Sequence, residues 1–157
     1  MRLSEIMQKP VRTISTTEDA NVAWNRMRQF RVRHLAVEHE TRVVGVISAA
    51  DLGGKHGDIL RNGRHVGDLL TEKLVVAAPD TTVREAANLM RGHAINCLLV
   101  FEGSKLKGIV TTLDLLELIG RGAERPVATA ERKILKKRGE QPRQQSAAKR
   151  LAGAKGR

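Results

Sequence analysis

Aromatic residues and cysteine are scarce in this chain of 157 residues. Phenylalanine, tryptophan and tyrosine make up 2% of the sequence, which excludes a platform on which several nucleic-acid bases could stack. The single cysteine, Cys97, has no partner for an internal disulfide or a cysteine zinc cluster, and this favours a reducing compartment. No stretch of about 18 apolar residues is present, and the residues after Met1 do not form a signal peptide. We therefore expect a cytoplasmic protein.

Acidic residues are lacking mainly in the last part of the chain. Residues 1–120 contain 16 Lys and Arg against 14 Asp and Glu, whereas residues 121–157 contain 12 against 3. The net charge of +11 therefore belongs mostly to the C-terminal segment. We predict that the nearly neutral part folds around an apolar core, and that residues 123–157 form a basic, disordered tail.

The sequence does contain a duplication. When the chain is shifted by 63 residues, residues 3–52 fall on residues 66–115 without a gap, and nine positions are identical. Glycine and aspartate recur six residues apart in both copies, as Gly45 with Asp51 and Gly108 with Asp114. Because this pairing is hard to obtain by chance, we assign one repeat to residues 1–60 and a second to residues 61–122.

Each copy predicts the element order β-α-β-β-α, and together they predict a mixed α/β (α+β) fold. Predicted helices cover 20–30 and 83–90, and predicted strands cover 11–14, 35–38, 43–47, 74–77, 98–101 and 106–110. Thr82 and Glu85 form a capping box before the helix of the second copy. A final helix begins near each repeated aspartate, and Gly53 and Gly54 indicate that the first of these helices is short or broken. A repeat of about 60 residues is marginal alone, so we expect the two copies to pack sheet to sheet.

The last strand of each copy leads into the final helix through the pattern Gly-apolar-apolar-Ser/Thr-x-x-Asp. Glycine allows a ligand or a neighbouring strand to approach the backbone closely. Ser48 and Thr111 place hydroxyl groups beside the amides of a helix start, where a phosphate is favoured. Asp51 and Asp114 only accept hydrogen bonds when ionised, so each can accept both hydroxyls of a ribose. The same residues also form capping boxes that simply start a helix, and the two interpretations are compatible.

This doubled pattern, the repeat length and the element order resemble the CBS-domain family, whose members occur in tandem pairs called Bateman modules. The resemblance covers residues 1 to about 122, and the stretch Val32 to Val37 is similar to the family's apolar-basic-basic-Leu-Pro-Val segment. Ala36 and Leu99 stand where proline is usual in that segment. The resemblance implies a flat disc with two clefts related by a pseudo-twofold axis. It also implies a non-catalytic regulatory module that binds AMP, ADP, ATP or S-adenosylmethionine.

The resemblance further implies roles for individual residues. Asp51 and Asp114 would hold ribose, and Ser48 and Thr111 would hold phosphate. The extended stretches would pair their backbones with adenine, and the residues concerned are Arg12, Thr13, Val75 and Val76. Val32 and Ile95 would pack against the base, and Arg33 and His34 would contact phosphate. Asn96 and Cys97 stand at the latter positions of the second copy, so a second phosphate site needs Arg33 or His34 to reach across the axis.

The other reactive residues do not predict chemistry. The five histidines show no metal-ligand spacing, and Cys97 beside an apolar strand is interpreted as an inert core thiol. We therefore predict no enzymatic activity, no metal and no catalytic cofactor. Expected partners are an adenosine nucleotide, a second copy of the chain and an unidentified protein target.

Two alternatives remain open at this point. The basic tail could bind RNA, DNA or an acidic partner without sequence specificity, with the repeats acting only to dimerise it. The repeats could also have lost ligand binding and serve purely as a structural dimerisation unit.

Overall fold

The fold was analysed in a computed structural model that describes residues 1–70 and 74–120. The predicted tail over 123–157, with its possible nucleic-acid binding, lies outside the described residues. Within the described part, no helix is long and apolar enough to cross a membrane.

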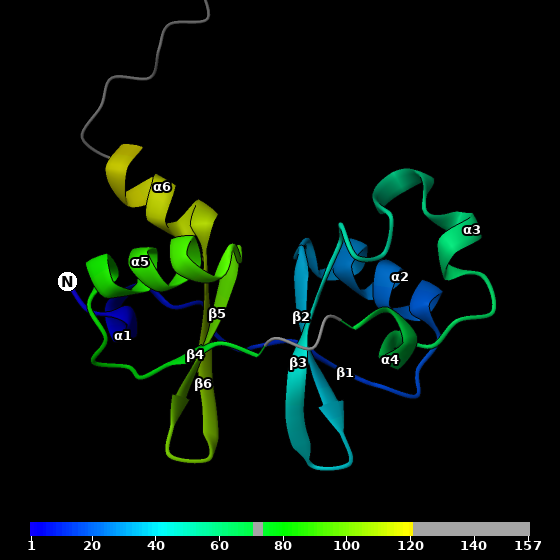
Figure 1. The fold of residues 1–157 in the computed structure, drawn as a ribbon, viewed down its shortest axis with the longest axis horizontal. Helices are drawn as coiled ribbons and strands as arrows, with labels where there is room; N and C mark the ends of the chain where they lie inside the picture. The colour runs from blue at the N-terminus through cyan, green and yellow to red at the C-terminus, as the bar shows by residue number, and fades with distance from the viewer. Residues whose placement is uncertain (71–73, 121–157) are drawn as a thin grey trace, which may run out of the picture. The chain divides into compact units, whose positions relative to one another are not determined.

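The two repeats contain corresponding elements (Figure 1). The first contains α1 (Leu3–Ile6), β1 (Thr13–Ser15), α2 (Ala20–Phe30), β2 (His34–His39), β3 (Arg42–Ser48), the 3-10 helix η1 (Gly54–His56) and α3 (Asp58–Arg61). The second contains α4 (Val66–Leu69), β4 (Val76–Ala77), α5 (Val83–His93), β5 (Cys97–Glu102), β6 (Lys105–Thr111) and α6 (Thr112–Gly120). The predicted α/β class and the doubled element order are confirmed.

Each repeat builds one three-stranded sheet, with strand order β1-β2-β3 in the first and β4-β5-β6 in the second. The first strand of each sheet is parallel to the second, and the second is antiparallel to the third. In the first sheet Ala36 pairs with Thr13 and Val46. In the second sheet Leu99 pairs with Val76 and Ile109. Each residue of the first set lies 63 positions before its counterpart in the second set. The sequence repeat is therefore also a repeat of strand register.

The long helices begin at side-chain caps and bury one face. Asp19 caps α2 by accepting a hydrogen bond of 2.7 Å from the backbone N–H of Asn21. Thr82 and Glu85 form the predicted capping box of α5. The two helices end at Arg31 and Ala94, both in the left-handed conformation with φ of 54° and 53°. The buried alanines and methionines of these helices then cover their sheets, as expected from their spacing.

The repeats differ after the last strand. In the second repeat, α6 follows β6 directly. In the first repeat, turns and a 3-10 helix replace it, because Gly53 and Gly54 adopt positive φ values of 75° and 61°. The predicted break in this helix is therefore confirmed, and glycine tolerates the left-handed conformation that causes it.

The leading segments of the two repeats are exchanged, a feature that the sequence does not reveal. Leu3 of α1 is fully buried in the core of the second repeat, and its N–H donates to Thr81 O at 2.9 Å. Val66 of α4 is fully buried in the core of the first repeat, and its N–H donates to Glu18 O at 2.9 Å. Figure 1 shows α1 beside the sheet β4–β6 and α4 beside the sheet β1–β3. The exchange ties each repeat to the start of the other.

The repeated glycines make room for these exchanged segments. A Cβ atom on Gly45 would lie 2.9 Å from Leu70 Cδ1, and one on Gly108 would lie 2.6 Å from Met7 Sδ. Leu70 and Met7 are themselves 63 residues apart. The close approach predicted at the glycines is therefore made by side chains of the opposite repeat.

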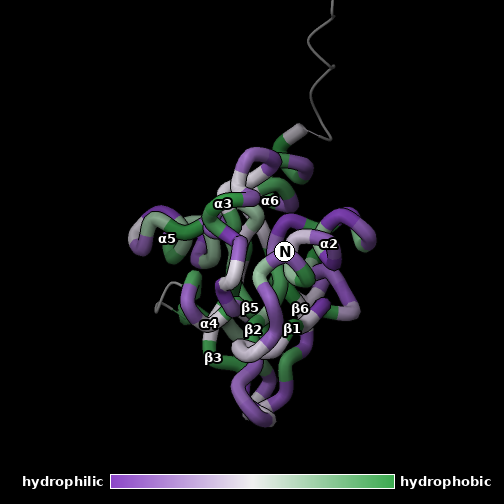
Figure 2. Tube along the Cα trace, turned by 90° about the vertical axis from the view of Figure 1, so that its right-hand side faces the viewer, coloured by the Kyte–Doolittle hydropathy of each residue, from purple (hydrophilic) through white to green (hydrophobic). Residues whose placement is uncertain are grey.

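A third apolar cluster joins the two sheets. Ala36 from β2 is buried together with Cys97, Leu99 and Ile109 from β5 and β6. This confirms the expected sheet-to-sheet packing, and Figure 2 shows the apolar strands at the middle, flanked by helices of mixed hydropathy.

Candidate functional site: two clefts between the repeats

The first cleft, of about 450 Å³, is lined by both repeats. The first repeat contributes Val11, Arg12, Val32, Arg33, His34 and Ser48. The second repeat contributes Asn96, Ile109, Thr111, Thr112 and Leu113. The cleft thus combines the residues before β1 and β2 with the start of α6.

The second cleft, of about 250 Å³, has the reciprocal composition. The second repeat contributes Val75, His93, Ala94, Ile95, Asn96 and Cys97. The first repeat contributes His34, Val46, Ser48 and Asp51. Each cleft therefore combines the strand-leading segments of one repeat with the Ser/Thr-x-x-Asp segment of the other.

Most of the residues singled out in the sequence line these clefts. Arg12, Val32, Arg33, His34, Ser48 and Thr111 line the first, and His34, Ser48, Asp51, Val75 and Ile95 line the second. Thr13, Val76 and Asp114 line neither. Thr13 lies within β1, and its carbonyl accepts a hydrogen bond of 2.8 Å from Arg26 Nη1. The lining residues Arg12 and Val75 directly precede the strands that contain Thr13 and Val76.

The two Ser/Thr-x-x-Asp segments form closed hydrogen-bonded boxes. Asp51 Oδ2 accepts from both the N–H and the hydroxyl of Ser48, each at 2.7 Å. Asp114 Oδ2 accepts from Thr111 N–H at 2.6 Å and from its hydroxyl at 2.7 Å. In the second copy this box lies at the start of α6, in agreement with the capping interpretation, whereas in the first copy the same contacts close a turn because no helix directly follows Ser48. One carboxylate oxygen of each aspartate remains outside the box.

Gln8 contacts that remaining oxygen in one of the two boxes. Its Nε2 donates to Asp114 Oδ1 at 2.5 Å, and Gln8 also lines the first cleft. The backbone of Gln8 pairs with Ile109 through two hydrogen bonds of 2.9 and 3.2 Å. Sequence reasoning missed Gln8, because its place at the cleft depends on the exchange of the leading segment.

His34 lines both clefts and is the titratable side chain that they have in common. Burial, together with the nearby Arg33 guanidinium, lowers the pKa of His34, while Asp51 and Asp114 oppose this effect. A His34 pKa below its ordinary value of 6.5 leaves the imidazole neutral at pH 7. Of the two basic residues expected to reach across, His34 lines both clefts and Arg33 lines the first only.

Cys97, at the second cleft, occupies the position in β5 that His34 occupies in β2. Burial and the nearby carboxylate of Asp51 raise the pKa of the Cys97 thiol to about 11. The thiol is therefore protonated at neutral pH, in agreement with its interpretation as an inert core residue. Within residues 1–70 and 74–120, no group of three or more His, Cys, Asp or Glu side chains is placed to hold a metal.

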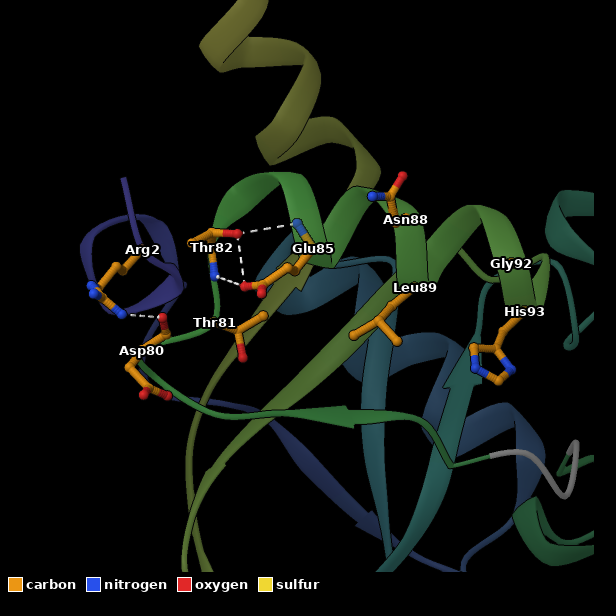
Figure 3. Close-up of a pocket in the computed structure, with 9 residues that line it drawn as sticks. All are labelled: Arg2, Asp80, Thr81, Thr82, Glu85, Asn88, Leu89, Gly92 and His93. Atoms are coloured by element: carbon orange, nitrogen blue, oxygen red, sulfur yellow. Dashed lines mark hydrogen bonds between the residues drawn. The ribbon is translucent and has the colours of Figure 1, made fainter.

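A larger cavity, of about 800 Å³, is lined by residues of α5 and of the segment before it (Figure 3). Its polar side chains are largely engaged with one another. Thr82 and Glu85 form the cap of α5, and Arg2 Nη1 donates to Asp80 O at 2.6 Å. His93 lines both this cavity and the second cleft. None of the residues that the sequence predicted to bind a ligand lines this cavity.

Comparison with known proteins identifies the repeat. The family model described as "CBS domain" matches residues 3–52 and 66–121. Inosine-5'-monophosphate dehydrogenase from Methanocaldococcus jannaschii is 29% identical over 118 residues, which cover 74% of this chain and 23% of that enzyme. The CBS domain-containing protein YhcV from Bacillus subtilis is 33% identical over 66 residues, covering 40% of this chain and 47% of that protein. The chain thus spans less than half of these curated relatives.

Solved structures share the fold over nearly their whole length. The CBS domain pair of protein MJ0100, in complex with 5'-methylthioadenosine and S-adenosyl-L-methionine, superposes with a TM-score of 0.70 at 22% identity. The match covers 78% of this chain and 98% of that pair. An uncharacterised conserved protein from Pyrococcus horikoshii gives a TM-score of 0.66 at 26% identity, covering 78% of this chain and 95% of that protein. With both repeats matched by the family model and by the fold, this chain belongs to the CBS-domain family as a tandem CBS pair.

Proposed function

We propose that this CBS pair is a non-catalytic regulatory module that binds an adenosine-containing compound in the clefts between its repeats. The observation that carries the proposal is the reciprocal construction of the two clefts. In the first cleft, Val32, which precedes β2, lies with the hydroxyl of Thr111 from the second repeat. In the second cleft, Ile95, which precedes β5, lies with Ser48 and Asp51 from the first repeat. A purine needs an apolar wall, and a ribose and phosphate need polar groups, so each cleft offers both kinds of contact.

The apolar wall consists of corresponding residues in the two repeats. Val32 lines the first cleft and Ile95 lines the second, and both are half-buried. Their backbones are fixed in the same way, because Val32 N–H donates to Met27 O and Ile95 N–H donates to Met90 O, each at 3.0 Å. A base inserted into either cleft would therefore meet a preformed apolar surface.

The polar side of the second cleft suits a ribose. Asp51 is half-buried there, and only its Oδ2 atom takes part in the Ser48 box. Within residues 1–70 and 74–120, Asp51 Oδ1 has no hydrogen-bond donor. Asp114 itself does not line the first cleft, and its corresponding oxygen accepts from Gln8, which does line that cleft. A ribose there would bind beside Gln8 or displace it to reach Asp114.

The ligands bound to the CBS pair of MJ0100 support the choice of an adenosine compound. That pair binds 5'-methylthioadenosine and S-adenosyl-L-methionine, and it shares the present fold. For this chain the candidates are AMP, ADP, ATP and S-adenosylmethionine. Such a ligand regulates only if it binds one conformation of the module more tightly than another. Each cleft is lined by residues of both repeats, so its ligand affinity depends on how the two repeats are arranged.

Thermal unfolding with each of these four compounds tests the proposal. A ligand present at 100 times its dissociation constant stabilises the folded state by about 2.7 kcal/mol. The double variant Asp51→Asn/Asp114→Asn keeps one acceptor oxygen for each box and should lose most of the ligand-induced shift. Glu85→Gln alters the matching box of α5, which lies outside both clefts, and should keep the shift. If none of the four compounds raises the melting temperature of the wild-type protein, the proposal fails.

Homodimer formation, cytoplasmic localisation and the unidentified protein target remain predictions from the sequence. So does the role of residues 123–157.

A further inference from the structure

A third cavity, which we call the basic pocket, adjoins the first cleft. It has a volume of about 390 Å³ and is lined by Trp24, Met27, Arg28, Val32, Arg33, Ala49, Ala50, Gly54 and Lys55. Val32, Arg33, Ala49 and Ala50 line the first cleft as well. The two cavities are therefore adjacent, and Arg33 is the charged side chain that lines both.

All charged side chains that line the basic pocket are cationic. They are Arg28, Arg33 and Lys55, and each is exposed to solvent. Across the described part of the chain, none of the three forms an ion pair with a carboxylate. Their positive charge is thus available to an anion rather than neutralised within the protein.

The first cleft adds further positive charge next to this pocket. Arg12 and Arg31 line it together with Arg33, and no acidic residue is among its lining side chains. The guanidinium of Arg12 lies 3.9 Å from the ring centroid of Phe30, which holds it in place at the cleft. A planar guanidinium fixed in this way is well suited to contact phosphate oxygens.

The second repeat has no equivalent of this charge. The residues 63 positions after Arg12, Arg31, Arg33, His34 and Lys55 are Val75, Ala94, Asn96, Cys97 and Leu118. Arg28 alone keeps its charge, as Arg91. The difference is therefore a property of the first repeat and not of the duplicated fold.

The basic pocket exists because the first repeat lacks a regular last helix. The positions that would correspond to Gly54 and Lys55 lie within α6 in the second repeat. In the first repeat, Gly53 and Gly54 turn the chain away. Arg61, which is fully buried, fixes this turn by donating to Leu52 O at 2.7 Å and Gly54 O at 2.8 Å. The pocket is thus a built feature with a rigid rim.

From this geometry we propose that the first cleft and the basic pocket together select an adenosine di- or triphosphate. The adenosine part occupies the first cleft. Arg33, which lines both cavities, contacts the phosphate nearest to the ribose, and Arg28 and Lys55 bind the terminal phosphates. The inference rests on the proposed function and makes it more specific. Each phosphate adds negative charge, and the terminal phosphate of ATP lies two phosphate groups further from the ribose than that of AMP. With adenosine in the first cleft, the phosphate chain of ATP reaches Arg28 and Lys55 and that of AMP does not, so the basic pocket favours ATP over AMP. The second cleft, which contains Asp51 and lacks arginine, does not share this preference.

The test compares the affinities of ATP and AMP by titration calorimetry in the full chain. The variant Arg28→Gln/Lys55→Gln removes two charged contacts with the terminal phosphates, and we expect its ratio of ATP to AMP affinity to fall about tenfold or more. The charge-conserving variant Arg28→Lys/Lys55→Arg should keep most of that ratio. Arg91→Gln/Lys105→Gln is the matched control, because it removes the same charge from exposed positions outside the basic pocket.

Each possible result of this comparison supports or overturns the proposal. A selective loss of ATP affinity in the glutamine variant, absent from the matched control, supports the proposal. An unchanged ratio, or equal losses of ATP and AMP affinity, overturns it. If the wild-type protein binds no adenosine compound, inorganic tripolyphosphate is titrated instead. Binding that depends on Arg28 and Lys55 then supports the anion pocket although the proposed function has failed, and no binding overturns both.

Discussion

Arg61 is the buried charge on which the shape of the first repeat depends. Its side chain is fully buried, and its guanidinium makes four hydrogen bonds. Two go to the carbonyls of Leu52 and Gly54, one goes to Asn21 Oδ1 at 3.1 Å, and one goes to Asp58 Oδ1 at 2.5 Å. The guanidinium also lies 4.7 Å from the ring centroid of Trp24. Each of the three guanidinium nitrogens therefore donates at least one hydrogen bond.

The substitution Arg61→Met removes the donors but keeps an unbranched apolar side chain against Trp24. The carbonyl of Leu52 loses its donor in a buried setting, whereas the carbonyl of Gly54 loses one donor and keeps the N–H of Gly57 at 3.3 Å. A buried acceptor left without a partner costs about 1–3 kcal/mol, and the other lost hydrogen bonds add to this, so we expect a total loss of about 3 kcal/mol in the free energy of unfolding. Asp58→Asn should cost less than about 1 kcal/mol, because the Asp58 side chain is 85% exposed.

Urea unfolding measures both variants. A change in midpoint at constant m-value gives the loss of stability directly. The reasoning is refuted if Arg61→Met costs less than about 1 kcal/mol, or if Asp58→Asn costs as much as Arg61→Met. Because Arg61 holds the rim of the basic pocket, Arg61→Met should also reduce the preference for ATP over AMP in the fraction that remains folded.

Two further predictions concern acid stability and the exchanged segments. Since the pKa of His34 is lowered in the fold, the unfolded state takes up the proton first as the pH falls below 6.5. The free energy of unfolding should therefore decrease from pH 7 towards pH 5.5, and less steeply in His34→Gln; equal slopes would contradict the assignment. Gly108→Ala should cost about 1–3 kcal/mol because its Cβ would meet Met7, and Met7→Ala in the same chain should recover part of this loss. Gly92→Ala, with open space around its Cβ, is the control and should be neutral or stabilising, whereas additive effects of the Gly108 and Met7 changes would refute the contact.

The fold was predictable from the sequence because the duplication repeats its constraints. A register in which Ala36 pairs with Val46 and Leu99 pairs with Ile109 follows from two copies of one apolar pattern. The exchange of leading segments was not predictable in the same way. The sequence pattern is the same whether Met7 packs against its own repeat or against the other one. Only the contact between Met7 and Gly108 in the structure shows that it packs against the other repeat.

The candidate site was predictable to within about one residue. Val32 and Ile95 line the clefts as expected, and so do Arg12 and Val75. Thr13 and Val76 do not, because these strand residues lie one position too far along the chain. The basic pocket was missed although Gly53 and Gly54 indicated the broken helix, because the sequence does not show that Arg61 is buried in this turn or that Arg28 and Lys55 line one cavity.

If ligands bind in both clefts as proposed, we expect the two binding events to be coupled, because the clefts share side chains. His34 and Ser48 line both, and the charge of His34 is influenced by Asp51 and by Asp114. A phosphate bound beside His34 in the first cleft favours its protonated form, which then presents a positive charge to the second cleft. A ligand in the second cleft that disfavours this charge would weaken phosphate binding in the first cleft. Because coupling between two sites is reciprocal, the phosphate would weaken binding of that ligand by the same factor. This coupling is the expected consequence of building each cleft from residues of both repeats.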